Sequence, residues 1–243
     1  MPDYLDPPAS PPPSTAARIG IVAAVRTVEM PFGSIAVHAV ADDYVTAIAR
    51  AGGLPVALPA LGEEWTESLV GTVDGIVLTG GPDLDPATYG ERSDGSVGSD
   101  PVRDALEIGI ARAALRRRCP VLAVCRGLQI LNVATGGSLR QHVDGHLGAS
   151  VRHRVDAVPG SHLARAVGAT SFDTGSLHHQ AVARLGTGLR ITGRADDGTV
   201  EALEAADGAP LLAVQWHPEL EGGWVSASLF AWLVARAEEA RWT

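Results

Sequence analysis

Short apolar runs rich in β-branched residues alternate with segments of helical periodicity from Arg18 onward. This alternation predicts βαβ units, and therefore a mostly parallel sheet with helices on both faces. Asp100 followed by Pro101 is typical of a helix start, because the carboxylate caps the first amides and proline needs no N–H there. The expected strands lie at 18–25, 54–58, 75–79 and 120–124, and the expected helices at 38–51, 101–118, 126–134 and 224–240.

The C-terminal third has a different pattern, with three short strands expected at 189–193, 200–204 and 211–215. Asp-Gly pairs at 197–198 and 207–208 mark turns between them, as in antiparallel hairpins. We therefore expect an α/β fold: a single doubly wound, mostly parallel sheet, with antiparallel strands added near the C-terminus. Residues 18–243 are predicted to form one domain, 1–17 a disordered Pro-rich tail, and 141–152 a loop.

Composition excludes several classes of function. A net charge of −9 argues against a nucleic-acid-binding surface. The sequence contains no lysine, which excludes a Schiff base, pyridoxal phosphate chemistry and a Walker-type phosphate loop. Two cysteines make a disulfide framework implausible, and no Cys/His array with zinc-finger spacing is present. No metal or organic cofactor is expected. No segment predicts a membrane span or a signal peptide, so we expect a cytoplasmic protein.

Cys125 ends an apolar run, 120–124, and a helical pattern follows it at once. A strand–turn–helix of this kind presents a nucleophile at the end of a sheet, where the first helix amides favour a thiolate. Such a turn needs small residues two positions to either side, and here they are Ala123 and Gly127. Cys119 has no such context and is interpreted as a core cysteine.

A second candidate is the segment from Gln215 to Glu219, in which His217 precedes Pro218. A residue before proline is pushed toward extended conformations, in which residues i and i+2 project to the same side. Glu219 is therefore expected to bond one ring nitrogen of His217, leaving the other for the thiol. The alternative is a surface loop with an incidental glutamate.

Two further motifs carry polar or flexible residues. Thr79-Gly80-Gly81-Pro82-Asp83 follows an expected strand, so its amides suit an oxyanion hole, although the motif taken alone is better explained as an ordinary strand-ending turn. Ser176-Leu177-His178-His179-Gln180 precedes an apolar run. Its histidines suit substrate contacts or a satisfied polar network; a metal site lacks an evident third ligand.

Together, the motifs at 78–83, 124–129, 176–182 and 214–219 resemble the class I glutamine amidotransferase-like superfamily, whose fold is flavodoxin-like. Within it, the chain is most similar to the γ-glutamyl-γ-aminobutyrate hydrolase family, also called peptidase family C26. The segment 100–104 and the His-His-Gln triplet favour that branch over ammonia-donating subunits. The likeness extends from about Ile19 to Ala235.

The resemblance implies roles for individual residues. Cys125 would be the nucleophile, His217 the general base and acid, and Glu219 the residue that orients His217. The amides of Gly81 and Arg126 would form the oxyanion hole. The residues implied in substrate binding are Gly80, Gln129, Ser176, His178 and His179.

Three features depart from the family pattern: Ala123 stands before the nucleophile where glycine is usual, Gly175 replaces a frequent asparagine, and 146–154 matches poorly.

The predicted reaction is hydrolysis of a γ-glutamyl amide through a Cys thioester, releasing glutamate and an amine. The expected partner is a small γ-glutamyl substrate, with no nucleic acid or membrane, and pairing of many relatives makes a homodimer one state to test. Two alternatives stay open: a glutaminase that supplies ammonia to a synthetase, and a non-catalytic binding protein. An α/β-hydrolase is set aside, because its acid precedes the histidine in the chain.

Overall fold

The computed structural model describes residues 13 and 15–241. The predicted tail, 1–17, therefore lies almost wholly outside the described residues. At its end, Ala16 and Ala17 are already buried. No helix in the described part of the chain has the length and hydropathy needed to span a bilayer.

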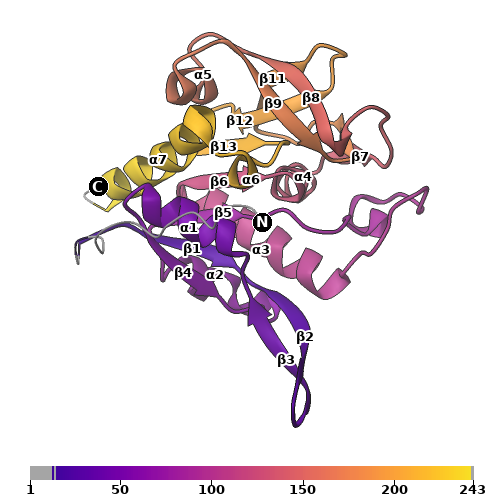
Figure 1. Ribbon diagram of the computed structural model, residues 1–243, viewed down its shortest axis with the longest axis vertical. Helices are drawn as coiled ribbons and strands as arrows, with labels where there is room; N and C mark the ends of the chain where they lie inside the picture. The colour runs from indigo at the N-terminus through magenta and orange to yellow at the C-terminus, as the bar shows by residue number, and fades with distance from the viewer. Residues whose placement is uncertain (1–12, 14, 242–243) are drawn as a thin grey trace.

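The described residues form a central sheet of nine strands, in the order β4-β1-β5-β6-β13-β12-β11-β8-β9 (Figure 1). The first five strands run parallel, and the others join antiparallel. The parallel strands are β4 (Leu54–Leu58), β1 (Arg18–Val22), β5 (Gly75–Leu78), β6 (Val121–Val124) and β13 (Leu211–Val214). The antiparallel strands are β12 (Val200–Ala205), β11 (Leu189–Ala195), β8 (Leu147–Ala157) and β9 (Ser171–Leu177).

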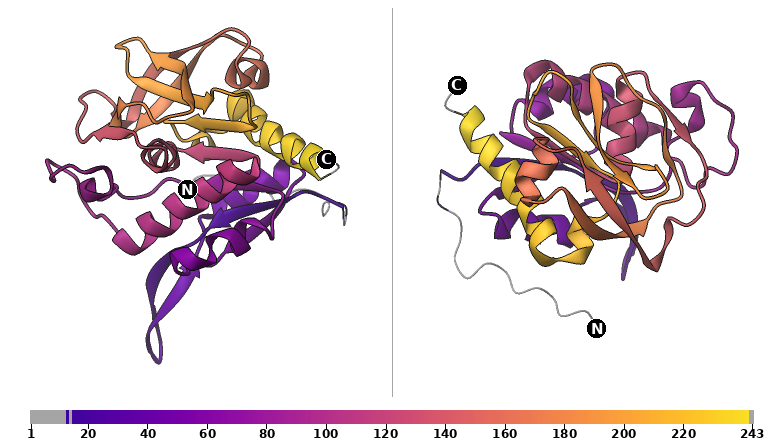
Figure 2. Two further views of the ribbon diagram at one scale, coloured as in Figure 1. Left: turned by 180° about the vertical axis from the view of Figure 1, so that it is seen from behind. Right: turned by 90° about the horizontal axis from the view of Figure 1, so that it is seen from above.

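Helices cover both faces of this sheet, as Figures 1 and 2 show. Two separate apolar clusters, one on each face, form the core. One layer contains α2 (Thr66–Val70), α3 (Pro101–Arg117) and α4 (Arg126–Ala134). The other contains α1 (Asp42–Arg50), α5 (His162–Val167), α6 (Pro218–Glu221) and α7 (Gly223–Ala240). The predicted doubly wound α/β fold with added antiparallel strands is confirmed.

A β-hairpin that the sequence did not reveal projects from the domain in Figure 1. It consists of β2 (Ala24–Met30) and β3 (Gly33–Ala39), with Gly33 at φ +123° in the turn. The predicted first strand therefore ends at Val22, and the predicted helix 38–51 begins only at Asp42. Most hairpin side chains are exposed, so the alternation that marks a half-buried strand is missing.

The loop predicted at 141–152 is also partly wrong, because β8 begins at Leu147. β8 pairs with β9, and their register shifts between Gly148 and Arg152. The polar composition of β8 and this irregularity hide the strand from a pattern search. A small two-stranded sheet, β7 (Ser138–Arg140) with β10 (Ala181–Arg184), lies nearby. Two 3₁₀ turns, η1 (Glu63–Trp65) and η2 (Pro86–Tyr89), complete the described elements.

The close contact between α4 and β5 depends on Gly127. A Cβ at this position would lie 2.2 Å from the carbonyl oxygen of Leu78. We predict that Gly127→Ala lowers the free energy of unfolding by roughly 1–3 kcal/mol, the usual cost of overpacking. Urea unfolding measures the effect. Gly71→Ala is the control, because the backbone of Gly71 is helical (φ −68°) and a Cβ there would have no neighbour nearer than 3.3 Å; equal losses in both variants would contradict the prediction.

Candidate active site

Three neighbouring parallel strands, β5, β6 and β13, end at the same edge of the sheet. Gly80 follows β5, Cys125 follows β6 and His217 follows β13. Ligand sites of open α/β sheets lie at this edge, beyond the carboxyl ends of the strands. The fold thus brings Cys125 and His217 together although they are far apart in the sequence.

Cys125 lies in a strained turn between β6 and α4. Its backbone adopts φ +51° and ψ −105°, and among described non-glycine residues only Arg118 shares a positive φ. Cys125 donates its N–H to Val214 O (2.8 Å), which anchors the turn to β13. The residue is 6% exposed. The predicted turn at Cys125 between strand and helix, here called the elbow, is therefore confirmed. Its backbone is strained in the way that is typical of functional sites.

His217 lies between Cys125 and Glu219. Its Nδ1 is 2.6 Å from Glu219 Oε1, and its ring packs so closely on Gly80 that a Cβ there would lie 2.7 Å from Cε1. Burial lowers the pKa of His217, but hydrogen bonds to Cys125 and Glu219, and their negative charges, outweigh burial and raise it to about 10. The imidazole beside the Cys125 sulfur is therefore protonated at neutral pH.

The backbone that joins His217 to Glu219 differs from the expectation. His217 avoids the helical region (φ −111°, ψ 81°), as a residue before proline should. Pro218 then begins the short helix α6, so the segment is not extended through Glu219. The predicted contact between the two side chains forms nevertheless.

Tyr44 is a site residue that the sequence did not reveal. Its hydroxyl accepts a hydrogen bond from Gly80 N (2.9 Å). Burial and the neighbouring Glu219 raise the pKa of Tyr44 well above its ordinary value, so the phenol stays protonated. In the sequence, Tyr44 is one aromatic residue in an amphipathic helix, which is the pattern of a core residue.

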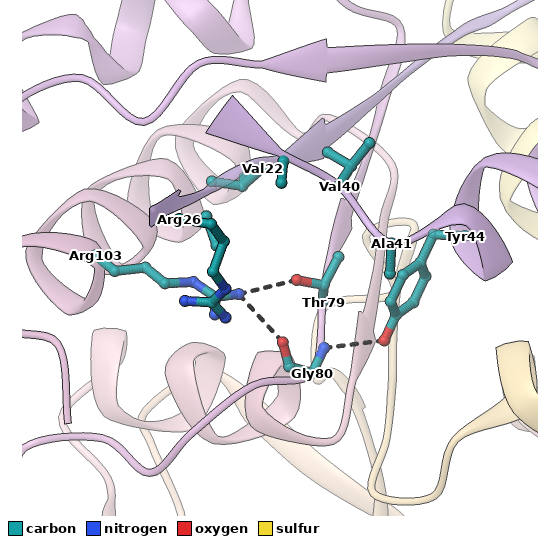
Figure 3. Close-up of a pocket in the computed structure, with 10 residues that line it drawn as sticks. Val22, Arg26, Val40, Ala41, Tyr44, Thr79, Gly80 and Arg103 are labelled. Atoms are coloured by element: carbon teal, nitrogen blue, oxygen red, sulfur yellow. Dashed lines mark hydrogen bonds between the residues drawn. The ribbon is translucent and has the colours of Figure 1, made fainter. Parts of the chain in front are cut away.

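Four buried charges support this edge of the sheet. Arg126 Nη2 lies 2.5 Å from Asp104 Oδ1, and its Nη1 bonds Glu107. Arg103 Nε lies 2.5 Å from Glu107 Oε1. Arg103 Nη2 also donates to Thr79 Oγ1 (3.0 Å) and Gly80 O (3.1 Å), as Figure 3 shows. This network, Arg103–Asp104–Glu107–Arg126, links α3 to the first residue of α4.

The residues predicted for the oxyanion hole lie on either side of the elbow. Arg126 is the first residue of α4, where a backbone N–H has no partner within the helix. Gly81 packs against the buried arginines, because a Cβ there would lie 2.5 Å from Arg103 Nη1. Gly80, predicted to contact substrate, has its N–H occupied by Tyr44. The oxyanion roles stay predictions.

The other residues predicted to bind substrate are largely taken up by internal contacts. Gln129 donates to Gln180 O (3.4 Å), and His179 Nε2 lies 3.0 Å from Asp83 Oδ1. Ser176 and His178 are buried beside His146. Their substrate-binding roles also stay predictions.

Two cavities lie near the carboxyl edge of the sheet. One, of about 260 Å³, is lined by Tyr44, Gly80, Arg26 and Arg103 (Figure 3). The other, of about 220 Å³, includes His217 in its lining and is bounded by β8, β9 and α6.

Comparison with known proteins shows what the chain is similar to. The family model described as Peptidase C26 matches residues 18–219. The γ-glutamyl-γ-aminobutyrate hydrolase of Escherichia coli (strain K12) is 41% identical over 197 residues, covering 73% of this chain and 77% of that protein. A Mycobacterium tuberculosis (strain ATCC 25618 / H37Rv) protein, provisionally named a glutamine amidotransferase, is 38% identical over 213 residues (83% of this chain, 69% of the relative).

A solved structure shares the fold at low sequence identity. It is a crystal structure of a Thermoplasma acidophilum protein that is provisionally identified as a component of GMP synthase. Its TM-score is 0.67 at 14% identity, and the match covers 93% of this chain and 96% of that chain. At this identity the likeness shows a common fold alone.

The raised pKa of His217 leads to a pH prediction. Because the folded-state value, about 10, exceeds the ordinary value near 6.5, the ion pair stabilises the fold fully below pH 6.5. That stabilisation is lost as pH rises through the folded-state value. Glu219→Gln removes one charge, so we predict that the pKa falls by about 1–2 pH units.

Nuclear magnetic resonance titration of the His217 ring measures this pKa. Glu238→Gln, an exposed change on α7, is the matched control. An unchanged His217 pKa in Glu219→Gln would show that Glu219 does not set the protonation state.

Proposed function

Because the chain belongs to the peptidase C26 family, we propose that it hydrolyses the γ-glutamyl amide bond of a γ-glutamyl-amine, releasing glutamate and the amine. The observation that carries this proposal is the placement of Cys125 and His217 at the carboxyl edge of the sheet, with His217 Nδ1 2.6 Å from Glu219 Oε1. A nucleophile, a base and an orienting carboxylate are the parts that covalent acyl transfer requires.

In the proposed first half-reaction, the Cys125 thiolate attacks the γ-carbonyl carbon and a C–S bond forms. The carbonyl oxygen gains the negative charge, and the amides of Gly81 and Arg126 donate to it. As the C–N bond breaks, protonated His217 gives its proton to the departing nitrogen. The products are a γ-glutamyl thioester and the free amine.

In the second half-reaction, neutral His217 takes a proton from water, whose oxygen attacks the thioester carbonyl. The C–S bond breaks, glutamate leaves, and the thiolate–imidazolium pair is restored. The high pKa of His217, about 10, supports the acid role, because the proton is present at neutral pH when the amine must depart.

The glutaminase alternative has its own support, since three relatives, 36–40% identical, carry glutamine amidotransferase names. The hydrolase is favoured by a 41% identical relative named for γ-glutamyl-γ-aminobutyrate hydrolysis. Turnover of free glutamine alone, together with recovery of a synthetase in a pull-down, would reverse this preference. Failure of Cys125 to react with an electrophilic γ-glutamyl analogue would instead favour the non-catalytic binding protein. Cytoplasmic location and homodimer formation stay predictions.

The charges that line the cavity beside Gly80 affect which amine the γ-glutamyl substrate carries. Arg26 is exposed at its wall, whereas the charge of Arg103 is balanced by Glu107. An amine that ends in a carboxylate, such as γ-aminobutyrate, would pair with Arg26, and a cationic polyamine would be repelled. The cavity therefore favours γ-glutamyl-γ-aminobutyrate over γ-glutamyl-polyamines.

Replacement of the nucleophile tests the reaction. Cys125→Ala is expected to abolish release of glutamate, because no thioester can form, while the circular dichroism spectrum and Tm stay near those of the parent. Cys119→Ala, which changes the other cysteine, should retain turnover. Retained turnover in Cys125→Ala, measured by mass spectrometry on γ-glutamyl conjugates, would refute the assignment.

Replacement of Arg26 tests the choice of amine. Arg26→Gln should raise KM for γ-glutamyl-γ-aminobutyrate by about fivefold, the equivalent of the ~1 kcal/mol of a partly exposed ion pair. KM for γ-glutamyl-ethylamine, which lacks the carboxylate, should not change. Arg236→Gln, an arginine change on α7, is the control. An equal rise for both substrates would contradict the charge argument.

A further inference from the structure

A second cluster of titratable side chains is buried in the antiparallel half of the sheet. His146 and His178 are each 3% exposed, and Glu201 is wholly buried. His146 immediately precedes β8, His178 immediately follows β9, and Glu201 lies in β12. His153, on β8, lies against the same group, with its ring centroid 4.9 Å from that of His146. The proposed reaction uses none of the four in a chemical step.

The polar atoms of this cluster converge on one point. Glu201 Oε1 lies 3.6 Å from His146 Nδ1 and 3.4 Å from His178 Nε2. One ligand atom from each of the three residues lies within 4.8 Å of the other two. Both carboxylate oxygens and His178 Nε2 are buried without a hydrogen-bond partner. Buried polar atoms are rarely left in that state, so an unseen cation is the direct explanation.

The other nitrogen of each ring faces a hydrogen-bond acceptor. His178 Nδ1 lies 3.0 Å from Gln180 O, a carbonyl oxygen that can only accept, so Nδ1 donates. His146 Nε2 lies 3.0 Å from Asp197 Oδ2. The Ser176 hydroxyl lies 2.6 Å from His146 O and 3.2 Å from His146 Nδ1, and a metal ion at Nδ1 would displace the second of these contacts.

Glu201 Oε1 and His178 Nε2 are buried without a hydrogen-bond partner, and a metal ion bound between them would satisfy both. Metal-bound histidines characteristically donate their other N–H to a carboxylate or a backbone carbonyl, as His146 and His178 do here. In a tetrahedral zinc site with bonds of about 2.0–2.1 Å, neighbouring ligand atoms lie roughly 3.3 Å apart. Two of the three separations, 3.4 and 3.6 Å, fit that geometry, and the third, between the two histidine nitrogens, is at most 4.8 Å.

We propose that His146, His178 and Glu201 bind a divalent transition metal, with Zn²⁺ as the best-matched ion. Imidazole and carboxylate donors suit Zn²⁺ better than Mg²⁺ or Ca²⁺, which prefer oxygen ligands alone. His153 Nε2, 3.4 Å from Glu201 Oε2, supplies a fourth donor close by. The ion would connect the start of β8 and the end of β9 to β12.

The test uses the full chain, stripped of metal with a chelator and titrated with Zn²⁺. We expect one equivalent bound by elemental analysis, and a Tm increase of roughly 5–10 °C at a hundredfold excess over Kd. His178→Ala and Glu201→Gln should each lose the bound equivalent. His142→Ala, which removes an exposed histidine, should keep it.

The competing outcome is that Zn²⁺ binds the thiol of Cys125 instead, and the variant Cys125→Ala distinguishes the two sites. The proposal requires that Cys125→Ala retains the metal and the Tm increase; loss of both would overturn it. Co²⁺ substitution in the parent chain gives a readout that does not depend on the folding of any variant. Visible bands of tetrahedral Co²⁺ without a thiolate charge-transfer band are expected. A thiolate band, or no bound metal and no Tm change, would overturn the proposal, and in the last case the cluster holds protons.

Discussion

The network Arg103–Asp104–Glu107–Arg126 is the interaction on which the rest of the site depends. Its two cations and two anions balance, so the burial of each charge is tolerable only while its partners remain. Loss of one partner from such a group typically costs about 3–5 kcal/mol, because an unpaired charge is left in the interior. Arg126 directly follows Cys125, and Arg103 binds the carbonyl oxygen of Gly80. The network therefore positions the elbow relative to the glycine loop, residues 79–83.

Close packing, in addition to the charged network, positions the residues of the site. Gly127 allows α4 to approach the carbonyl oxygen of Leu78, and Gly80 allows the ring of His217 to lie against the β5 loop. Cys125 is held at positive φ between β6 and α4, while its N–H is tied to β13. Three parallel strands thus share one strained junction. The backbone around Cys125 and His217 is closely packed, and this packing holds the sulfur near the imidazole.

The sequence predicted the parts of the site that follow buried strands. Cys125 and His217 each end an apolar run, and parallel strands bring such ends to one edge. Tyr44 and Glu201 were missed because their roles arise from partners that are not neighbours in the sequence, Gly80 for Tyr44 and His146 and His178 for Glu201, and each has a local pattern typical of a packed helix or strand. The hairpin β2–β3 and the strand β8 were missed for another reason: their exposed or polar side chains remove the alternation on which strand prediction relies. Local pattern thus predicted the nucleophile and its base, while long-range pairing decided what surrounds them.

The Ser176–Gln180 segment connects the two polar centres of the molecule. Ser176 and His178 turn toward His146 and Glu201, whereas His179 reaches Asp83 at the end of the glycine loop. The carbonyl oxygen of Gln180 accepts from Gln129 on α4 and from His178. The strand β9 ends at Leu177 and the chain bends at His179, so the adjacent histidines bind different parts of the fold. Whatever occupies the His146–Glu201 cluster, proton or metal, therefore fixes the segment that borders the cavity beside His217.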